Sequence, residues 1–402
     1  MPKPLSSAPL HVLLAGGGSG GHVFPALTLA DELQERGHQV TFAGSSQGLE
    51  ARLVTARDIP FHALAARPLV GQGVFGKAKA VATLGLSAVA ARSLVRRLGV
   101  RAVVGTGGYV SAPALVGARL ASLPVLLLEP NARSGVANRW LSRLAAEAAV
   151  AYEQTSQEFA CPSLVTGVPV RQVFFETPGL EEAPAVPRPP RLLVLGGSQG
   201  ALQLNQALPE AVVEAAKVLG GLEITHQCGE RHLAVTQQAY DDAVRSAGSP
   251  PPGQAESGQV SSEAGDFGQG VVDRGPLVKV VPFLEDMAGA MGQSDLIISR
   301  AGAVTLAEIC AAGRPSLLVP LAGALGHQLD NGRVLETAGA AQVLLPEQVE
   351  RNFLAESLAK LLGDRSKLVS MGSCARSLAR RDSATLIADR VEALAGFERG
   401  EG

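Results

Sequence analysis

Two stretches of this chain open alike, and that repetition is the strongest constraint on its fold. An apolar run leads into a glycine-rich turn and then a helical pattern in HVLLAGGGSGGHVFPALTLADEL, residues 11–33, and again in RLLVLGGSQGALQLNQAL, residues 191–208. A strand, a glycine-rich turn and a helix in this order form the opening unit of a doubly wound α/β domain. The repetition therefore predicts two such domains in one chain.

Short apolar runs alternate with helical patterns through both halves, which predicts parallel sheets covered by helices on both faces. The proline-rich segment 176–191 is expected to link an N-terminal domain, residues 1–175, to a C-terminal domain, residues 192–380. Residues 381–402 are expected to form a C-terminal helix or tail, for which a return to the N-terminal domain is one option. One large sheet with a long connection is the alternative architecture.

Composition indicates a globular protein without a strong overall electrostatic field. Hydrophobic residues make up 46% of the 402 positions and the formal net charge is -2, so the chain can bury more than one core and does not attract nucleic acid through its total charge. The four cysteines are too widely spaced for a zinc site or a disulfide framework, and we expect buried thiols in a reducing cytosol. Residues 246–276, rich in glycine, serine and proline, are expected to form a disordered surface insertion.

The first glycine-rich turn fits a dinucleotide-binding pattern only in part. Gly16, Gly18 and Gly21 match the GxGxxG spacing, but the nearest acid, Glu50, lies too far past the second apolar run to hold a ribose. A nicotinamide-dependent oxidoreductase is therefore a minor alternative. His22 follows the turn directly, and spacing alone leaves two roles open for it, a surface cap of the turn or a participant in chemistry.

Polar or glycine-rich segments follow three apolar runs of the N-terminal half, at the first turn, at GTGGYVSAPAL and at EPNARSGVANRWL. The carboxyl ends of parallel strands meet at one edge of a sheet, where open α/β sheets bind ligands. We therefore expect a polar acceptor pocket at this edge. The side chains expected there are His22, Tyr109, Glu129, Asn131 and Asn138.

The C-terminal half offers a site for a phosphate group. DLIISRAGAVTLAEICAAG places an apolar run, the turn Arg300 to Ala303 and a helix in sequence. Exposed backbone amides at such a helix start suit a phosphate. Glu308, inside the helix, can accept both hydroxyls of a ribose or can be an ordinary solvated charge.

A series of motifs runs in order from about His11 to Ala341: GGGSGGHVFPAL, GTGGYVSAP, EPNARSGVANRWL, GVPVR, GGSQGALQLNQALP, THQCGERH, PFLEDMAGAMGQSDLIISRAGAVTLAEI and HQLDNGRVLETAGAA. The series resembles MurG-type enzymes, the UDP-N-acetylglucosamine transferases that convert lipid I to lipid II in peptidoglycan synthesis. The resemblance implies a GT-B glycosyltransferase fold, two Rossmann-like domains facing a cleft, and inverting transfer without a metal or other cofactor. The sequence has no DxD pair to chelate a sugar-nucleotide pyrophosphate. Helix dipoles, backbone amides and an arginine would then meet the charge of the leaving UDP.

The resemblance also implies roles for individual positions. Its donor-binding positions fall on Arg171, Ser198, Phe283, Leu284, Ala303, Val304, Thr305, Glu308, His327 and Gln328. Its acceptor-binding positions fall on Ser19, Gly20, Gly21, Tyr109, Glu129, Asn131 and Asn138. His22 is implied to be the general base, since a neutral imidazole with a reference pKa of about 6.5 can accept the proton of the muramyl 4-hydroxyl as it attacks the anomeric carbon. The first glycine-rich turn is expected to face the pyrophosphate of the lipid acceptor.

Two departures from the family pattern affect these expectations. Pro130 stands where the family usually has glutamine, which removes a polar contact and a backbone donor near the acceptor. The stretch LAGALGHQ is more apolar than the usual loop before the HQ pair, so an ordinary loop residue is the alternative role for His327.

Membrane contact is expected at Pro68 to Gly99, which matches the segment through which the family binds the inner leaflet. Phe75 and Leu84 stand there among lysines and arginines, which predicts an interfacial helix with weak, reversible adsorption. The alternative is an ordinary amphipathic helix packed on the sheet. Uncharged stretches are too short or too proline-broken to span a bilayer, which needs about 20 apolar residues. We therefore expect a cytoplasmic protein, peripheral on the cytoplasmic face of the membrane.

The expected partners are UDP-GlcNAc, undecaprenyl-linked lipid I, the inner leaflet and other cell-wall and division proteins, with no nucleic acid. Three alternative functions stay open besides the oxidoreductase. They are a GT-B transferase with a soluble or hydrophobic aglycone acceptor, a UDP-sugar epimerase of similar fold, and a nucleotide-binding scaffold in a cell-wall complex.

Overall fold

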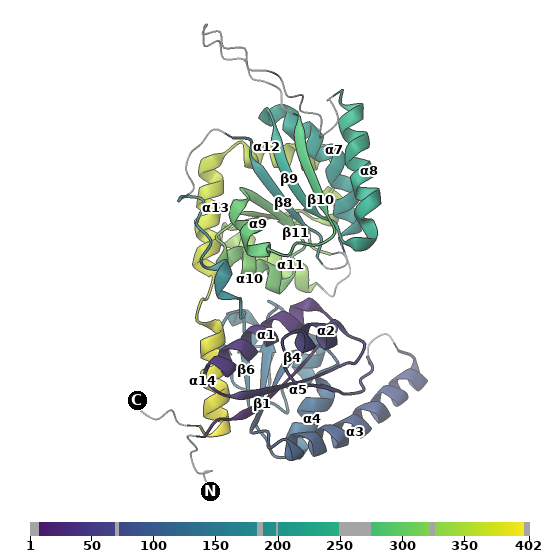
Figure 1. Ribbon diagram of the computed structural model, residues 1–402, viewed down its shortest axis with the longest axis vertical. Coiled ribbons are helices and arrows are strands. Elements are labelled where there is room, and N and C mark those ends of the chain that lie inside the picture. The colour runs from purple at the N-terminus through teal and green to yellow at the C-terminus, as the bar shows by residue number, and fades with distance from the viewer. Residues whose placement is uncertain are drawn as a thin grey trace.

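A parallel sheet organises the N-terminal domain of the computed structural model, which describes residues 8–68, 72–182, 188–197, 200–248, 275–321 and 326–397 (Figure 1). Its strands are β1 (His11–Gly16), β2 (Gln39–Gly44), β3 (Phe61–Ala63), β4 (Ala102–Gly107), β5 (Val125–Glu129), β6 (Glu147–Val150) and β7 (Ser163–Val165). Within the described residues they form one seven-stranded sheet in the order β3-β2-β1-β4-β5-β6-β7, and every neighbouring pair is parallel. The chain order reverses direction at β1 and β4, so the crevice of this domain lies at their carboxyl ends.

Helices cover both faces of this sheet. One apolar layer is formed with α1 (Gly20–Glu35), α2 (Leu49–Thr55) and α14 (Ser383–Ala395). The opposite layer is formed with α3 (Val74–Arg97), α4 (Ala112–Leu120) and α5 (Val136–Leu141). Strands β1, β4 and β5 consist almost entirely of apolar and small residues because both of their faces are buried in this way. The short helix α6 (Glu153–Ser156) follows β6.

The C-terminal domain repeats the same plan. Its strands are β8 (Arg191–Leu195), β9 (Leu222–Gln227), β10 (Pro276–Val281), β11 (Leu296–Ser299), β12 (Ser316–Leu318) and β13 (Ala341–Val343). The described strands form a parallel sheet in the order β10-β9-β8-β11-β12-β13, which places the crevice at the carboxyl ends of β8 and β11. Two sheets of this kind confirm the predicted fold class and rule out one large sheet.

Two apolar layers sandwich the second sheet. One contains α7 (Leu202–Leu219), α8 (Leu233–Ser246) and α12 (Arg351–Leu362), and the other contains α9 (Met287–Gln293), α10 (Ala303–Ala311) and α11 (His327–Thr337). Helix α13 (Arg365–Leu378) contributes to both layers. Single turns of 3₁₀ helix lie at Gln172–Phe174, Glu230–His232 and Pro346–Gln348.

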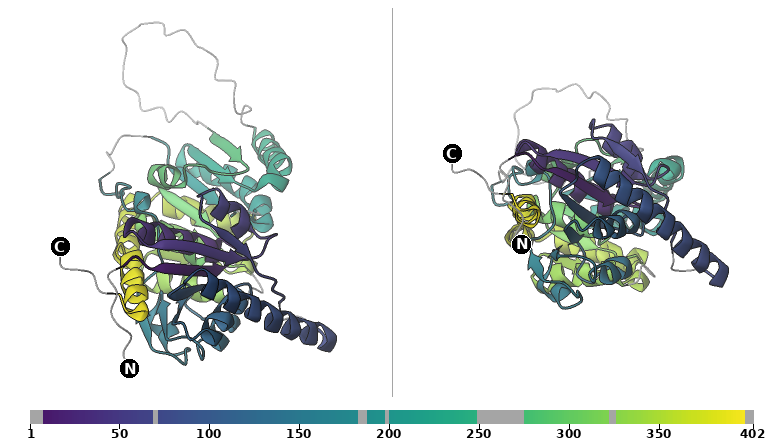
Figure 2. Two further views of the ribbon diagram at one scale, coloured as in Figure 1. Left: turned by 60° about the horizontal axis from the view of Figure 1, so that its bottom comes forward. Right: turned by 90° about the horizontal axis from the view of Figure 1, so that it is seen from below.

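The last helix, α14, lies against the N-terminal domain and not against the domain that precedes it in the chain (Figures 1 and 2). Ile387 and Val391 are fully buried in the N-terminal apolar layer. Arg390 pairs with Glu147 at 2.8 Å, and Asp389 pairs with Arg36 at 2.7 Å. The chain therefore crosses between the two domains twice, once before β8 and once after α13.

The expected linker 176–191 is partly packed on the C-terminal domain. Leu180 is 2% exposed within its core, and Arg188 donates two hydrogen bonds to the carboxylate of Asp295, at 2.7 and 3.0 Å. Residues 183–187 of this segment lie outside the described residues, as do 249–274 of the expected insertion. The prolines thus indicate the linker between the domains, but the described residues at both ends of this segment pack on the C-terminal domain.

The expectation that all four cysteines are buried needs correction. Among the cysteines, Cys228 and Cys310 are buried, but Cys161 and Cys374 are partly exposed because they lie at the margins of their apolar layers. Helix α3 is 24 residues long and, by length and composition only, apolar enough to cross a membrane, which by itself does not contradict the expected peripheral location. Lysines and arginines are spread along this helix, so its uncharged stretches are shorter than the helix itself.

Candidate active site

His22 lies at the carboxyl edge of the N-terminal sheet, in the first turn of α1. The turn that precedes it needs glycine at Gly18, whose φ of 84° is unfavourable for other residues. Ser19 has extended backbone and makes no side-chain cap, and no acidic residue stands in the first turn of α1. The first backbone amides of α1, which include those of Gly20 and Gly21, are therefore free of side-chain caps at the edge where a ligand would lie.

The imidazole of His22 is fixed by β4. Its Nδ1 lies 2.9 Å from the carbonyl oxygen of Thr106. A carbonyl only accepts hydrogen bonds, so Nδ1 carries the proton and Nε2 keeps its lone pair in the neutral ring. The ring packs on Gly107, where a Cβ atom would lie 2.5 Å from Nδ1. The GTGG turn therefore needs glycine at this position to accommodate the histidine.

Burial lowers the pKa of His22 below its usual 6.5, although Glu129, the Thr106 carbonyl and Glu50 each act to raise it. The loss of hydration outweighs these three favourable interactions. Near neutral pH the ring is therefore neutral, the form that a general base requires.

Glu129 organises the acceptor-side loop from the end of β5. It is 2% exposed. One carboxylate oxygen accepts from the backbone and side-chain amides of Asn131, at 3.1 and 2.8 Å, and the other accepts from Gly135 N at 2.9 Å and Asn138 Nδ2 at 3.1 Å. With both oxygens engaged, Glu129 holds the loop together and adds negative charge near His22.

The other acceptor-side residues differ in accessibility. Tyr109 is 43% exposed in the GTGG turn. Asn138 is buried, and its Oδ1 has no hydrogen-bond partner in the structure, so this oxygen can accept a bond from a ligand. Pro130 interrupts the loop between Glu129 and Asn131 but leaves both of these residues bonded to each other.

The loop after β5 contacts α11 of the other domain. Asn331, fully buried, accepts from Ala132 N at 2.7 Å and donates to Asn131 Oδ1 at 3.1 Å. His327 Nδ1 lies 3.0 Å from the Arg133 carbonyl, which makes this nitrogen a donor. Since both segments follow the carboxyl ends of strands, the carboxyl edges of the two sheets face each other.

On the C-terminal side, α10 begins at Ala303 without a side-chain cap and without an acid in its first turn. Ala303 and Val304 are buried and Thr305 is half-buried. Arg300, just before this helix, donates to Gln203 Oε1 at 3.2 Å and to the Val319 carbonyl at 3.0 Å. Arg300 thereby ties three segments around the crevice.

Glu308 lies in α10, which contacts α1. Burial raises the pKa of its carboxyl to about 7, and the positive charge of Arg171 counteracts this only in part. The guanidinium of Arg171 lies 5.0 Å above the ring of Phe174 at the crossing between domains. Glu308 is therefore not an ordinary solvated helix charge.

Neutral groups support the second glycine-rich turn. Gln227 accepts from Gly197 N at 2.9 Å and donates to the Gly197 carbonyl at 2.8 Å. Ser198 lies outside the described residues. Gln328, the second residue of the HQ pair at the start of α11, accepts a hydrogen bond from Leu321 N at 2.9 Å.

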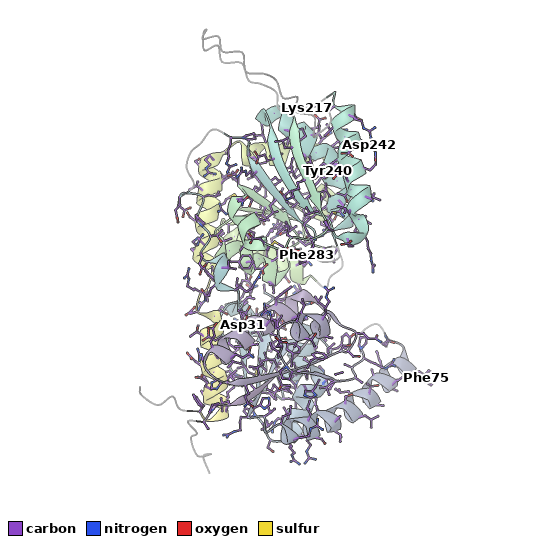
Figure 3. All side chains as sticks on the ribbon, in the orientation of Figure 1. Asp31, Phe75, Lys217, Tyr240, Asp242 and Phe283 are labelled. Atoms are coloured by element: carbon purple, nitrogen blue, oxygen red, sulfur yellow. The ribbon has the colours of Figure 1, made fainter. Side chains whose placement is uncertain are left out.

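Phe283, with 62% of its surface exposed, stands at the domain gap (Figure 3). It and the half-buried Leu284 also line a groove of about 810 Å³ that runs along β8, β9 and β10. His22 and Glu308 do not line this groove. In the part of the chain that the structure describes, no group of three or more His, Cys, Asp or Glu side chains could hold a metal ion.

Two doubly wound domains with facing carboxyl edges define the GT-B class of glycosyltransferase folds. Residues 12–150 match the glycosyltransferase family 28 N-terminal domain, and residues 191–248 and 253–389 match the glycosyltransferase family 28 C-terminal domain. The chain belongs to glycosyltransferase family 28.

Among its relatives, the UDP-N-acetylglucosamine--N-acetylmuramyl-(pentapeptide) pyrophosphoryl-undecaprenol N-acetylglucosamine transferase of Ectopseudomonas mendocina is 40% identical over 94% of this chain and 97% of that protein. The enzyme of the same name from Alkalilimnicola ehrlichii is 39% identical over the same shares. MurG of Acinetobacter baumannii has a similar structure, with a TM-score of 0.76, 32% identity and coverage of 96% of this chain and 100% of that one. The glycotransferase of kitacinnamycin, 17% identical with a TM-score of 0.61, shares the fold.

Four residues of this region were not predicted from the sequence or were predicted differently. The sequence marks Arg300 only as the start of a turn and does not mark Asn331 or Arg133, because a contact between domains leaves no local pattern. Glu50 is set aside by the sequence only as a ribose ligand, and its contact with Gly18 N, at 3.2 Å, is not predicted.

Proposed function

We propose that this chain transfers N-acetylglucosamine from UDP-GlcNAc to the 4-hydroxyl of the muramyl residue of lipid I, forming lipid II with inversion at the anomeric carbon. Relatives named for this transfer match it over 94% of its length. Within the structure, the observation that carries the proposal is His22, a neutral ring with one free nitrogen at the facing edges of two nucleotide-binding folds.

His22 acts as the general base in this reaction. Because Nδ1 donates to Thr106, only Nε2 can accept a proton. As the acceptor oxygen bonds to the anomeric carbon, its proton passes to Nε2, and the bond from that carbon to the β-phosphate oxygen breaks with its electron pair leaving on UDP. Glu129 then stabilises the imidazolium, since its carboxylate acts on the ring electrostatically.

The donor binds to the C-terminal domain. The uncapped amides at the start of α10, at Ala303, Val304 and Thr305, receive the pyrophosphate together with Arg171. Glu308, as a carboxylate, accepts the ribose hydroxyls. Phe283 and Leu284 contact the uracil, Ser198 belongs to the phosphate turn, and His327 with Gln328 contact the sugar. Charge on the leaving UDP is met by protein groups, so we expect transfer without a divalent ion.

The acceptor binds to the N-terminal domain. Its pyrophosphate faces Ser19, Gly20 and Gly21 at the start of α1, where backbone amides are uncapped. The muramyl group lies toward Tyr109 and the buried Oδ1 of Asn138, while Glu129 and Asn131 fix the loop around it. This arrangement brings the 4-hydroxyl to His22.

Helix α3 supports membrane adsorption. It extends from the N-terminal domain (Figure 2), and Phe75 stands near its tip (Figure 3). Large apolar side chains are exposed along it, at Val74 (82%), Phe75 (93%), Val81 (57%), Leu86 (77%) and Val89 (59%). Its other side packs on α4 through buried small and apolar residues. An exposed apolar face with Lys77 and Lys79 beside it suits the interface of an anionic bilayer, and we infer a peripheral location on the cytoplasmic leaflet.

The test is transfer of labelled GlcNAc from UDP-GlcNAc to a lipid I analogue, with and without a chelator. We expect a lipid II product in both conditions. Loss of transfer on chelation would contradict the metal-independent scheme, and transfer only to a soluble acceptor would favour another glycosyltransferase specificity.

Ligand titration separates the remaining alternatives. We expect UDP to bind and NADH not to bind, whereas an oxidoreductase would bind NADH. A scaffold protein would bind UDP without turnover, and an epimerase would convert UDP-GlcNAc in the absence of any acceptor.

A further inference from the structure

Glu50 is a buried carboxylate that the proposed reaction does not require. It lies in α2 and is 0% exposed. Its Oε2 accepts from Gly18 N at 3.2 Å and its Oε1 accepts from Ser45 N at 3.0 Å. Among the described residues, no lysine or arginine forms an ion pair with it. Backbone amides therefore hold this charge, in the way that they hold an anion at a glycine-rich turn.

The surrounding glycines leave room for this carboxylate. A Cβ atom at Gly17 or at Gly48 would lie 2.2 Å from a carboxylate oxygen of Glu50, and one at Gly44 would lie 2.7 Å from its Cγ. Three glycines from two segments thus surround one side chain. The glycines of the turn therefore fix the position of the Glu50 side chain, which is buried and not a freely rotating surface group.

We propose that Glu50 is a positioning residue for the transfer step, the internal anion that fixes the turn before His22 and stabilises the imidazolium formed when the acceptor hydroxyl is deprotonated. The inference rests on the proposed function, because it requires His22 to take a proton. Through Gly18, the carboxylate is bonded to the backbone that leads directly into the first turn of α1.

Three groups face His22 from the elements packed around it. They are the Thr106 carbonyl of β4, the Glu129 carboxylate of β5 and the Glu50 carboxylate of α2. Glu129 is engaged with the acceptor loop, so changing it would disrupt that loop as well. Glu50 is bonded to two backbone amides, Gly18 N and Ser45 N, and not to the acceptor loop, which makes it the better charge to remove.

The experiment compares Glu50→Gln with wild type in the lipid I transfer assay across pH. The neutral variant removes a charge that raises the pKa of His22, so the acid limb of the kcat profile should shift to lower pH. The value of kcat should fall by roughly tenfold because the turn is held less firmly. The KM for UDP-GlcNAc should not change, since that site lies in the other domain.

Glu147→Gln is the matched control. Glu147 is another largely buried carboxylate of the N-terminal domain, paired with Arg390 at 2.8 Å on α14. Its loss should lower stability and leave the acid limb in place. An acid limb that stays fixed in Glu50→Gln, or that moves equally in Glu147→Gln, would overturn the inference.

Glu50→Asp keeps the charge but shortens the side chain, and it serves if Glu50→Gln does not fold. It should retain the wild-type acid limb with a reduced kcat. A wild-type kcat in this variant would show that the contact with Gly18 does not position His22. Absence of transfer by the wild-type protein would instead reject the proposed function, so the two failures are distinguishable.

Discussion

Replacing Glu308 by glutamine should remove one contribution to the pH dependence of the stability of the C-terminal domain. Burial raises the pKa of this carboxyl from 4.5 to about 7 in the folded protein. The folded state therefore keeps a proton that the unfolded chain has already lost between these two values. Glu308 contributes its full stability below the unfolded pKa, and that contribution is lost as pH rises through the folded pKa.

The magnitude follows from the size of the shift. Each pKa unit corresponds to about 1.4 kcal/mol, so the wild-type protein carries a penalty of about 1 kcal/mol at pH 5 and about 3 kcal/mol at pH 8. Glutamine cannot ionise, so its own burial cost is the same at both pH values. The free energy of unfolding of wild type relative to Glu308→Gln should therefore fall by about 2 kcal/mol between pH 5 and pH 8.

Urea denaturation at the two pH values measures this difference. The single tryptophan, Trp140, lies in α5 and follows the N-terminal domain by fluorescence, while circular dichroism follows both domains. The pH-dependent difference should appear in the circular dichroism transition of the C-terminal domain. Equal pH dependence of wild type and variant would refute the argument that burial keeps Glu308 protonated.

The same substitution tests the donor site. If the carboxylate accepts ribose hydroxyls, Glu308→Gln should raise the KM for UDP-GlcNAc far more than the KM for the acceptor. In wild type, UDP should bind more tightly as pH rises through about 7, because the carboxylate form then predominates. That dependence should disappear in the variant.

Three further substitutions test other parts of the scheme. His22→Ala should lower kcat by about 10²- to 10⁴-fold in the transfer assay with little change in UDP binding, and near wild-type turnover would exclude His22 as the base. Asn331→Ala should destabilise the protein by about 2 to 4 kcal/mol in urea denaturation, because Ala132 N and Asn131 lose partners across the domain interface; a change under about 0.5 kcal/mol would contradict the role of this contact. Replacing Val74 and Phe75 by serine should reduce cosedimentation with anionic liposomes at low salt by about tenfold or more, and failure of the wild-type protein to sediment would contradict membrane adsorption through α3.

Residue patterns predicted the fold because its main signals are local. An apolar run such as VLLLE of β5 is buried on both faces, which is the condition that removes polar alternation from a strand. The short strands β3, β6, β7 and β13 were not predicted, since three or four residues give little pattern and β3, β7 and β13 lie at sheet edges. These strands are defined by their pairing with neighbouring strands, which the sequence of such a short run does not indicate.

The candidate site was only partly accessible from the sequence. Strand ends placed His22, Glu129 and Asn138 at one edge, and the structure brings the loops that carry them together. What the sequence could not give is the distance from Glu50 to Gly18, because it depends on how α2 packs, or the bonds from Asn331, because these form only when two domains meet. Contacts between residues that are far apart in the chain produce no recognisable spacing in the sequence.

The two glycine-rich turns look alike in sequence but differ in charge, and this difference limits where a diphosphate can bind. At the first turn the amide of Gly18 is already bonded to the carboxylate of Glu50, whereas at the second turn the amide of Gly197 is bonded to the neutral side chain of Gln227. A diphosphate brought to Gly18 would meet a buried negative charge, which costs far more in a protein interior than in water. Gln227 carries no charge, so it imposes no such repulsion on a diphosphate near Gly197. A pyrophosphate that binds at the N-terminal domain should therefore meet the start of α1 beyond Gly18 and not the amide of Gly18 itself.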